Sequence, residues 1–131
     1  MDDYNVVTVP AKSEDGIKSG VTVRAGDIFT VSGSGRASYG RGQVTYPDGT
    51  RYSDGKLSGA YMQPQVVLSG APVGMLIARI GSGPWLVVGS SQTMSAQEGG
   101  EVIVGYNDRP GMYGDNSGEY TVVVENHGGI S

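Results

Sequence analysis

Short apolar runs, either alternating with polar residues or rich in β-branched residues, recur along the chain and predict β-strands. In residues 28–32, Phe29 and Val31 alternate with Ile28, Thr30 and Ser32, so this strand is expected to bury one face, with Phe29 in the core. The other expected strands are residues 5–9, 21–24, 73–80, 85–88, 101–106 and 119–125, with a further apolar run at 66–68. No long segment keeps a helical period without an interrupting Gly or Pro. About eight short strands at close spacing favour an all-β fold, a two-sheet antiparallel β-sandwich.

Glycine and proline mark the segments between these runs. Residues 33–42, GSGRASYGRG, are expected to form a Gly-rich loop, although they lack the Lys-Ser/Thr of a phosphate-binding P-loop. Residues 44–54 hold a Pro-Asp-Gly turn between Tyr46 and Tyr52 and predict a surface hairpin or an excursion loop. Trp85 has two interpretations, an exposed platform for a ligand or, more commonly for a Trp beside Leu-Val-Val, a core or interface residue.

Composition excludes several classes of function. The 131 residues fit one domain spanning residues 1–131, and the net charge is −4 with dispersed arginines, so binding to nucleic acid is disfavoured. The chain has no cysteine, which removes disulfides and zinc–thiolate sites. No apolar run approaches the ~18 residues of a membrane span. The start, MDDY, has no signal-peptide pattern, so the expected location is the cytoplasm, or the exterior by a non-classical route.

The segment 106–120 carries the candidate chemistry. It connects two expected strands and holds Asp108, Asp115 and Asn116 among many turn-forming residues. Such a loop can bring two carboxylates, an amide oxygen and backbone carbonyls together, and Ca²⁺ takes hard oxygen ligands of this kind. The alternative is a solvated loop in which these side chains only hydrogen-bond their own backbone. The spacing is not that of an EF-hand.

The same loop resembles a known family. The pattern YND-x-PG-x-YG-x-NSG at 106–118 is similar to the calcium and galactose loop of the bacterial galactophilic lectins of the PA-IL (LecA-like) family. ASYG at 37–40 resembles that family's second binding segment, preceded by a strand like GDIFTV at 26–31. The sequence IG at 80–81, with the apolar run before it, is also similar. The resemblance extends over about residues 6–125, and only the two binding segments are specific.

The resemblance implies a small jelly-roll-like β-sandwich, a homo-tetramer, and one Ca²⁺ as cofactor. Galactose hydroxyls O3 and O4 would complete the coordination of the ion. The implied metal ligands are the carbonyls of Tyr39 and Met112 and the side chains of Asp108, Asp115 and Asn116. The implied or substitute sugar contacts are Tyr39, Asp108, Arg109, Met112, Asp115, Tyr52 and Asp54.

Several positions depart from the family pattern. Asp115 stands where the family usually has Asn, which adds a negative charge and replaces an amide donor by an acceptor-only group. Met112 replaces a Thr, and Arg109 replaces a small apolar residue beside the sugar. The family's His-Pro-x-Gln element is missing from residues 44–55, so contacts to the sugar's primary hydroxyl are in question. Tyr52 or Asp54 is the candidate substitute, with plain loop residues as the alternative.

Two other classes of function remain as alternatives. A glycoside hydrolase would use Asp108 and Asp115 as its carboxylate pair. A bound metal would keep both ionised and unfit as a general acid, and the single His127 offers no nucleophilic constellation, so a non-catalytic protein is expected. The third class is a carbohydrate-binding or adhesion module of a larger protein.

Overall fold

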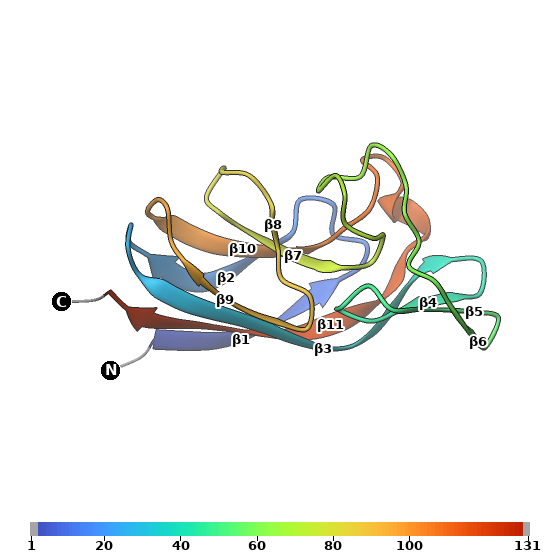
Figure 1. The fold of residues 1–131 in the computed structure, drawn as a ribbon, viewed down its shortest axis with the longest axis horizontal. Helices are drawn as coiled ribbons and strands as arrows, with labels where there is room; N and C mark the ends of the chain where they lie inside the picture. The colour runs from blue at the N-terminus through green and yellow to red at the C-terminus, as the bar shows by residue number, and fades with distance from the viewer. Residues whose placement is uncertain (1–2, 130–131) are drawn as a thin grey trace.

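The computed structural model describes residues 3–129. Two antiparallel sheets pack face to face, which confirms the predicted β-sandwich (Figure 1). The larger sheet contains β1 (Asp3–Pro10), β11 (Ser117–Gly128), β3 (Ile28–Gly40), β4 (Gln43–Thr45), β5 (Arg51–Ser53) and β6 (Lys56–Ser58), with β9 (Ser91–Ser95) also paired to β3. The smaller sheet contains β2 (Ile17–Val23), β10 (Gly100–Tyr106), β7 (Leu76–Ile80) and β8 (Leu86–Val87). A 3₁₀ turn, η1, covers Tyr113–Asp115.

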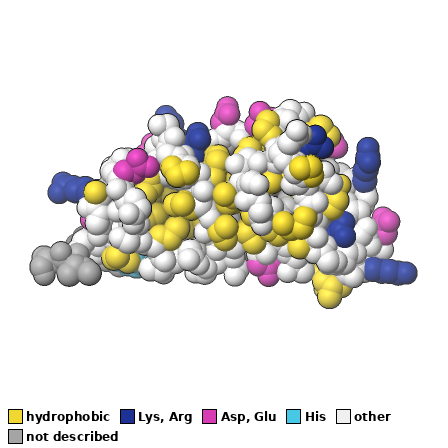
Figure 2. Space-filling model, turned by 45° about the horizontal axis from the view of Figure 1, so that its top comes forward, with side chains coloured by type: hydrophobic (Ala, Val, Ile, Leu, Met, Phe, Trp, Pro, Cys, Tyr) yellow, Lys and Arg dark blue, Asp and Glu magenta, His cyan; other side chains and the backbone are white. Residues whose placement is uncertain are grey.

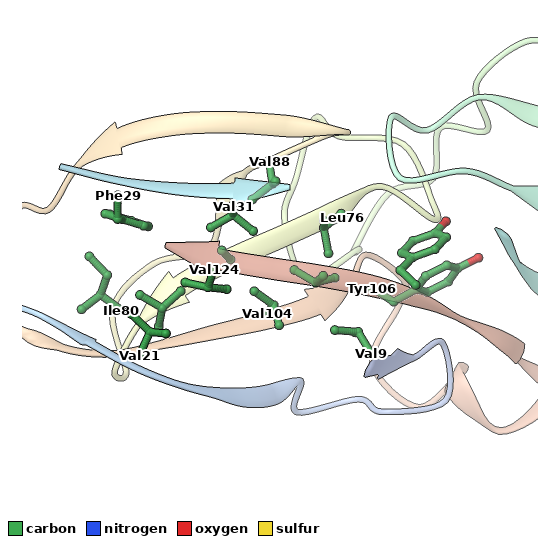
Figure 3. Packing of buried hydrophobic residues seen from close by; sticks show 14 of the residues in the cluster. Val9, Val21, Phe29, Val31, Leu76, Ile80, Val88, Val104, Tyr106 and Val124 are labelled. Carbon is green, nitrogen blue, oxygen red and sulfur yellow. The ribbon is translucent and has the colours of Figure 1, made fainter. Parts of the chain in front are cut away.

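The core lies between the two sheets. Phe29 and Val31 on β3 are buried as predicted, and they face side chains such as Ile80 and Val104 of the smaller sheet (Figure 3). Each fully buried side chain of this size stabilises the fold by about 1.5–3 kcal/mol relative to exposure. On the other face of β3, Thr30 and Ser32 hydrogen-bond to side chains of β9 instead. The alternation read from the sequence therefore sets which face of the strand is buried.

The predicted Gly-rich loop at 33–42 is wrong, because β3 continues through it to Gly40. β11 pairs with β3 along its whole length, from Ile28 to Ser38, so backbone hydrogen bonds support the glycines. At Gly33 an added Cβ would lie 2.5 Å from Cδ2 of Leu76 in the opposite sheet. Glycine is therefore needed there for close packing of the two sheets, and it does not signal a turn.

Three other segments also differ from expectation. Residues 91–95, predicted as a polar connection, pair with β3 instead, because β3 supplies the hydrogen-bond partners that their backbone would otherwise find in water. β8 is shorter than expected and exposed at Leu86 and Val87, since it is an edge strand. The apolar run at 66–68 forms no strand. Trp85 follows the more common of its two interpretations, because it is only partly exposed and packs against Gly105, with the Arg79 guanidinium 4.7 Å from its ring.

The predicted hairpin at 44–54 is confirmed as β4 and β5, and it extends from one end of the sandwich (Figure 1). A buried hydroxyl network joins it to the core. Thr45 Oγ1 lies 2.9 Å from the Tyr106 hydroxyl and 2.8 Å from the Tyr120 hydroxyl, and Tyr120 donates to the carbonyl of Gly74 at 2.7 Å. Because each group has a partner, the network fixes the hairpin relative to both sheets.

Within residues 3–129, no helix has the length and apolar character that crossing a membrane requires.

Candidate functional site

A cavity of about 390 Å³ opens at the hairpin end of the sandwich. Its walls come from the end of β3, the β4–β5 hairpin, the segment 61–73 and the loop 108–115. Five residues singled out from the sequence line it: Tyr39, Asp108, Arg109, Met112 and Asp115. The structure therefore brings together side chains separated by about 70 positions in the chain, because β3 and β11 are paired neighbours in the larger sheet.

Asp108 is the second residue after β10, and the buried Tyr113 hydrogen-bonds to its backbone. The Asp108 amide donates to the Tyr113 hydroxyl at 3.1 Å, and that hydroxyl donates to the Tyr106 carbonyl at 2.7 Å. Asp108 is itself only 6% exposed. Burial raises the pKa of its carboxyl, and the nearby Asp115 carboxylate adds to that increase, while hydrogen bonds from Asn116 and Arg109 oppose it. A cation at this place would offset the cost of two neighbouring carboxylates.

Asn116 is 1% exposed and is not among the cavity-lining residues, but its side chain contacts Asp108, which lines the cavity. Its Nδ2 donates to the Ala11 carbonyl and to Asp108 Oδ2, both at 2.9 Å. Its Oδ1 is buried and has no hydrogen-bond partner among the described residues. An unsatisfied buried acceptor costs about 1–3 kcal/mol, so this oxygen is suited to a ligand that accepts a lone pair, such as a metal ion.

The end of β3 meets the loop at Gly40. A Cβ on Gly40 would lie 3.2 Å from Asp115 Oδ2 and 3.6 Å from the Asp115 carbonyl oxygen. Gly40 also has φ of +101°, which disfavours any other residue there. Tyr39, just before it, therefore lies beside the 108–116 loop, as the two-segment site requires.

The oxygen set fits calcium better than a softer metal. Among residues 3–129, no group of three or more His, Cys, Asp and Glu side chains could hold a metal. The candidate donors are instead the carboxylates of Asp108 and Asp115, the free amide oxygen of Asn116 and the carbonyls of Tyr39 and Met112. Such a mixed, all-oxygen set is what Ca²⁺ accepts, with carboxylate, amide and backbone oxygens together.

Tyr52 and Asp54, the candidate substitutes for the missing family element, are not among the residues that line the cavity. Side chains alternate along β5, so Arg51 lines the cavity while Tyr52 packs edge-on against Tyr46. Asp54 lies at the following turn, where its amide donates to the Gly42 carbonyl. The structure therefore places neither candidate substitute in the cavity wall.

Sequence analysis missed half of the cavity wall. The additional lining residues are Arg41, Gln43, Arg51, Tyr61, Gln63 and Val73. The Tyr39 and Tyr61 rings stack at 5.0 Å, although they are far apart in the chain and in no common motif. The one available signal was the period-two alternation of the predicted hairpin, which places Gln43, Arg51 and Ser53 on one face.

Asn107 was also missed, although it is the residue that anchors the far wall. It is fully buried, its Nδ2 donates to the carbonyls of Leu68, Ala71 and Pro72, and its Oδ1 accepts from the Leu68 amide. These bonds tie the segment 68–72, which has no strand of its own, to the residue next to Asp108.

Known proteins are similar to this chain over most of its length. A family model described as "PA-IL-like protein" matches residues 5–128. "Lectin A" of Photorhabdus laumondii is 31% identical over 119 residues, which cover 89% of this chain and 87% of that protein. A solved structure titled "EclA N-terminal domain; PllA-like lectin" superposes with a TM-score of 0.70 at 26% identity, over 93% of this chain and 95% of the other.

Proposed function

The chain belongs to the PA-IL-like family of lectins, and on that premise we propose that it is a non-catalytic, calcium-dependent lectin for galactose-containing glycans. Asp108, Asp115 and Asn116 would hold the ion with their side chains, and Tyr39 and Met112 with their carbonyls. When bound, Ca²⁺ supplies coordination positions for two vicinal hydroxyls of the sugar.

The observation that carries this proposal is the buried, unpartnered Oδ1 of Asn116. Its amide is held in place by two hydrogen bonds from Nδ2, one of them to Asp108 Oδ2. The orphan oxygen and a carboxylate oxygen are thus fixed next to each other before any ligand arrives. A preorganised donor set of this kind lowers the entropic cost of binding the ion.

The other cavity residues would position the sugar. Asp108 and Asp115 carboxylates are acceptor-only, so sugar hydroxyls must donate to them. The stacked pair Tyr39 and Tyr61 offers an apolar surface beside the carboxylates, of the kind on which the C–H face of a sugar can rest.

A non-catalytic role agrees with the placement of the titratable groups. Both cavity carboxylates belong to the metal donor set, which leaves no carboxyl there as a general acid. His127 lies in β11, where its Nε2 is 2.9 Å from the Thr30 hydroxyl. Thr30 and His127 are not among the cavity residues.

A shallow site for one monosaccharide recovers modest affinity. We propose that useful avidity comes from several copies in a homo-oligomer, as the family resemblance implies, because linked sites raise effective concentration.

Isothermal titration calorimetry with methyl α-galactopyranoside tests the function. We expect binding heat in Ca²⁺, none after EDTA, and no product on prolonged incubation of a galactoside. Asp108→Asn should lose both metal and sugar binding, whereas Asp3→Asn, which removes the same charge at the exposed start of β1, should keep them. Sugar binding retained by Asp108→Asn, with circular dichroism showing a folded protein, would contradict the mechanism.

A further inference from the structure

The charged residues that line the cavity sum to a positive charge, whereas the net charge of the whole chain is negative. The chain carries a net charge of −4, yet three arginines and only two carboxylates line the cavity. Figure 2 shows several Lys and Arg side chains at this end, on the right, and others at the left-hand end. A local excess of positive charge in an acidic protein is suited to binding a negatively charged group.

Arg51 is held in place by four contacts, three of them with residues that line the cavity. Its Nε donates to the Gly59 carbonyl at 2.9 Å, and its Nη1 donates to the Tyr39 hydroxyl at 3.2 Å and to Gln43 Oε1 at 3.3 Å. Its guanidinium carbon also lies 5.3 Å from the centre of the Tyr61 ring. Each of these partners is neutral, so the contacts orient the charge without cancelling it.

Arg109 and Arg41 complete the basic group. Arg109 Nη2 donates to Gln65 Oε1 at 3.0 Å, again a neutral partner. Among residues 3–129, none of Arg41, Arg51 and Arg109 makes a direct ion pair with a carboxylate, although the charge of Arg109 lowers the pKa of the nearby Asp108 carboxyl. Once Ca²⁺ is held by Asp108 and Asp115, those carboxylates no longer balance the arginines, and the cavity becomes strongly positive.

We propose that the sugar taken by this site is an acidic galactoside, one that keeps its O3 and O4 hydroxyls and carries a carboxylate or sulfate at C6. This inference rests on the proposed function for the diol end of the site. Arg51 then binds the anionic group, and its planar fork of N–H donors suits a carboxylate or sulfate better than a neutral hydroxyl. Arg41 and Arg109 add to the positive potential around the group.

The test compares two matched ligands by calorimetry in Ca²⁺, methyl α-galactopyranoside and its C6 carboxylate, methyl α-galacturonide. We expect the uronide to bind about tenfold more tightly, since one hydrogen bond to a charged group exceeds its neutral counterpart by roughly that factor. The advantage should shrink as salt is added, because salt screens the charges. Galactose 6-sulfate, used alongside, shows whether the site prefers sulfate or carboxylate.

Arginine variants test which residue causes the preference for the acidic sugar. Arg51→Gln should bring the ratio of the two dissociation constants close to one, and Arg109→Gln should lower it partly and serves as a second variant if Arg51→Gln does not fold. Arg24→Gln removes an arginine at the turn between β2 and β3, at the opposite end of the sandwich, and should keep the ratio (Figure 1).

The outcomes separate the two proposals. If neither sugar binds in Ca²⁺, the proposed function is wrong. If the neutral galactoside binds and neither acidic sugar binds more tightly, or if Arg51→Gln and Arg109→Gln leave the ratio unchanged, only the acidic preference is wrong. Tight uronide binding that persists in EDTA would also overturn this inference, since the diol would then play no part.

Discussion

Replacing Tyr113 by Phe removes a single oxygen, the hydroxyl that hydrogen-bonds to the backbone of the proposed metal ligand Asp108. The Tyr113 hydroxyl accepts from the Asp108 amide at 3.1 Å and donates to the Tyr106 carbonyl at 2.7 Å. The ring is 3% exposed, so the Phe ring can occupy the same space. The substitution therefore leaves the packing intact and removes two hydrogen bonds around Asp108.

The structure allows the cost to be estimated. Two buried backbone groups lose their partner at about 1–3 kcal/mol each, so the free energy of unfolding should fall by about 2–6 kcal/mol. A chain of this length unfolds with an entropy of about 0.28 kcal/mol/K, which converts that loss to a decrease in Tm of about 7–21 °C. Because the Asp108 backbone is then less well fixed, the dissociation constant for Ca²⁺ should rise by about 10–100-fold, as for other residues that support metal ligands.

Differential scanning calorimetry and calcium titration measure the two effects. Tyr4→Phe is the matched control, since Tyr4 is exposed on β1 and should change neither quantity. A Tyr113→Phe protein that melts within about 2 °C of the wild type and binds Ca²⁺ equally well would refute the role given to this hydroxyl.

Three further predictions concern the ion, its second segment and pH. EDTA should lower Tm by about 10 °C relative to Ca²⁺ at about a hundredfold above its dissociation constant, and an unchanged midpoint in a thermal melt would count against a bound metal. Gly40→Ala should weaken Ca²⁺ binding in a calcium titration, because its φ is +101° and the new Cβ lies 3.2 Å from Asp115 Oδ2; equal affinity would mean that Asp115 is not a ligand. Hydrogen bonds from the Arg24 amide and from Asn126 hold the pKa of Asp27 below its ordinary value. The ionised Asp27 carboxylate therefore stabilises the fold at neutral pH, and this contribution is lost as pH falls through the lowered pKa. Asp27→Asn should therefore lose less stability on acidification than the wild type in denaturant titrations, and equal pH dependence would contradict this assignment.

Local pattern determined much of the fold. Alternation at Phe29 and Val31, together with apolar runs punctuated by Gly and Pro, was enough for a β-sandwich and for the buried face of β3, because a side chain's face in a strand depends only on its position along that strand. The oxygen-rich loop 106–120 was visible for the same reason, since its turn residues and its carboxylates are neighbours in the chain.

Strand pairing and the cavity wall were decided only by the tertiary structure. Residues 33–40 look like a loop until β11 supplies the hydrogen bonds along their backbone, and residues 91–95 look like a connection until β3 does the same. The stacking of Tyr39 on Tyr61 and the placement of Arg51 beside them likewise depend on how distant segments come together. The hydrophobic period shows which face of a strand a side chain lies on. The residues that it contacts across a sheet or a cavity depend on segments that are remote in the sequence.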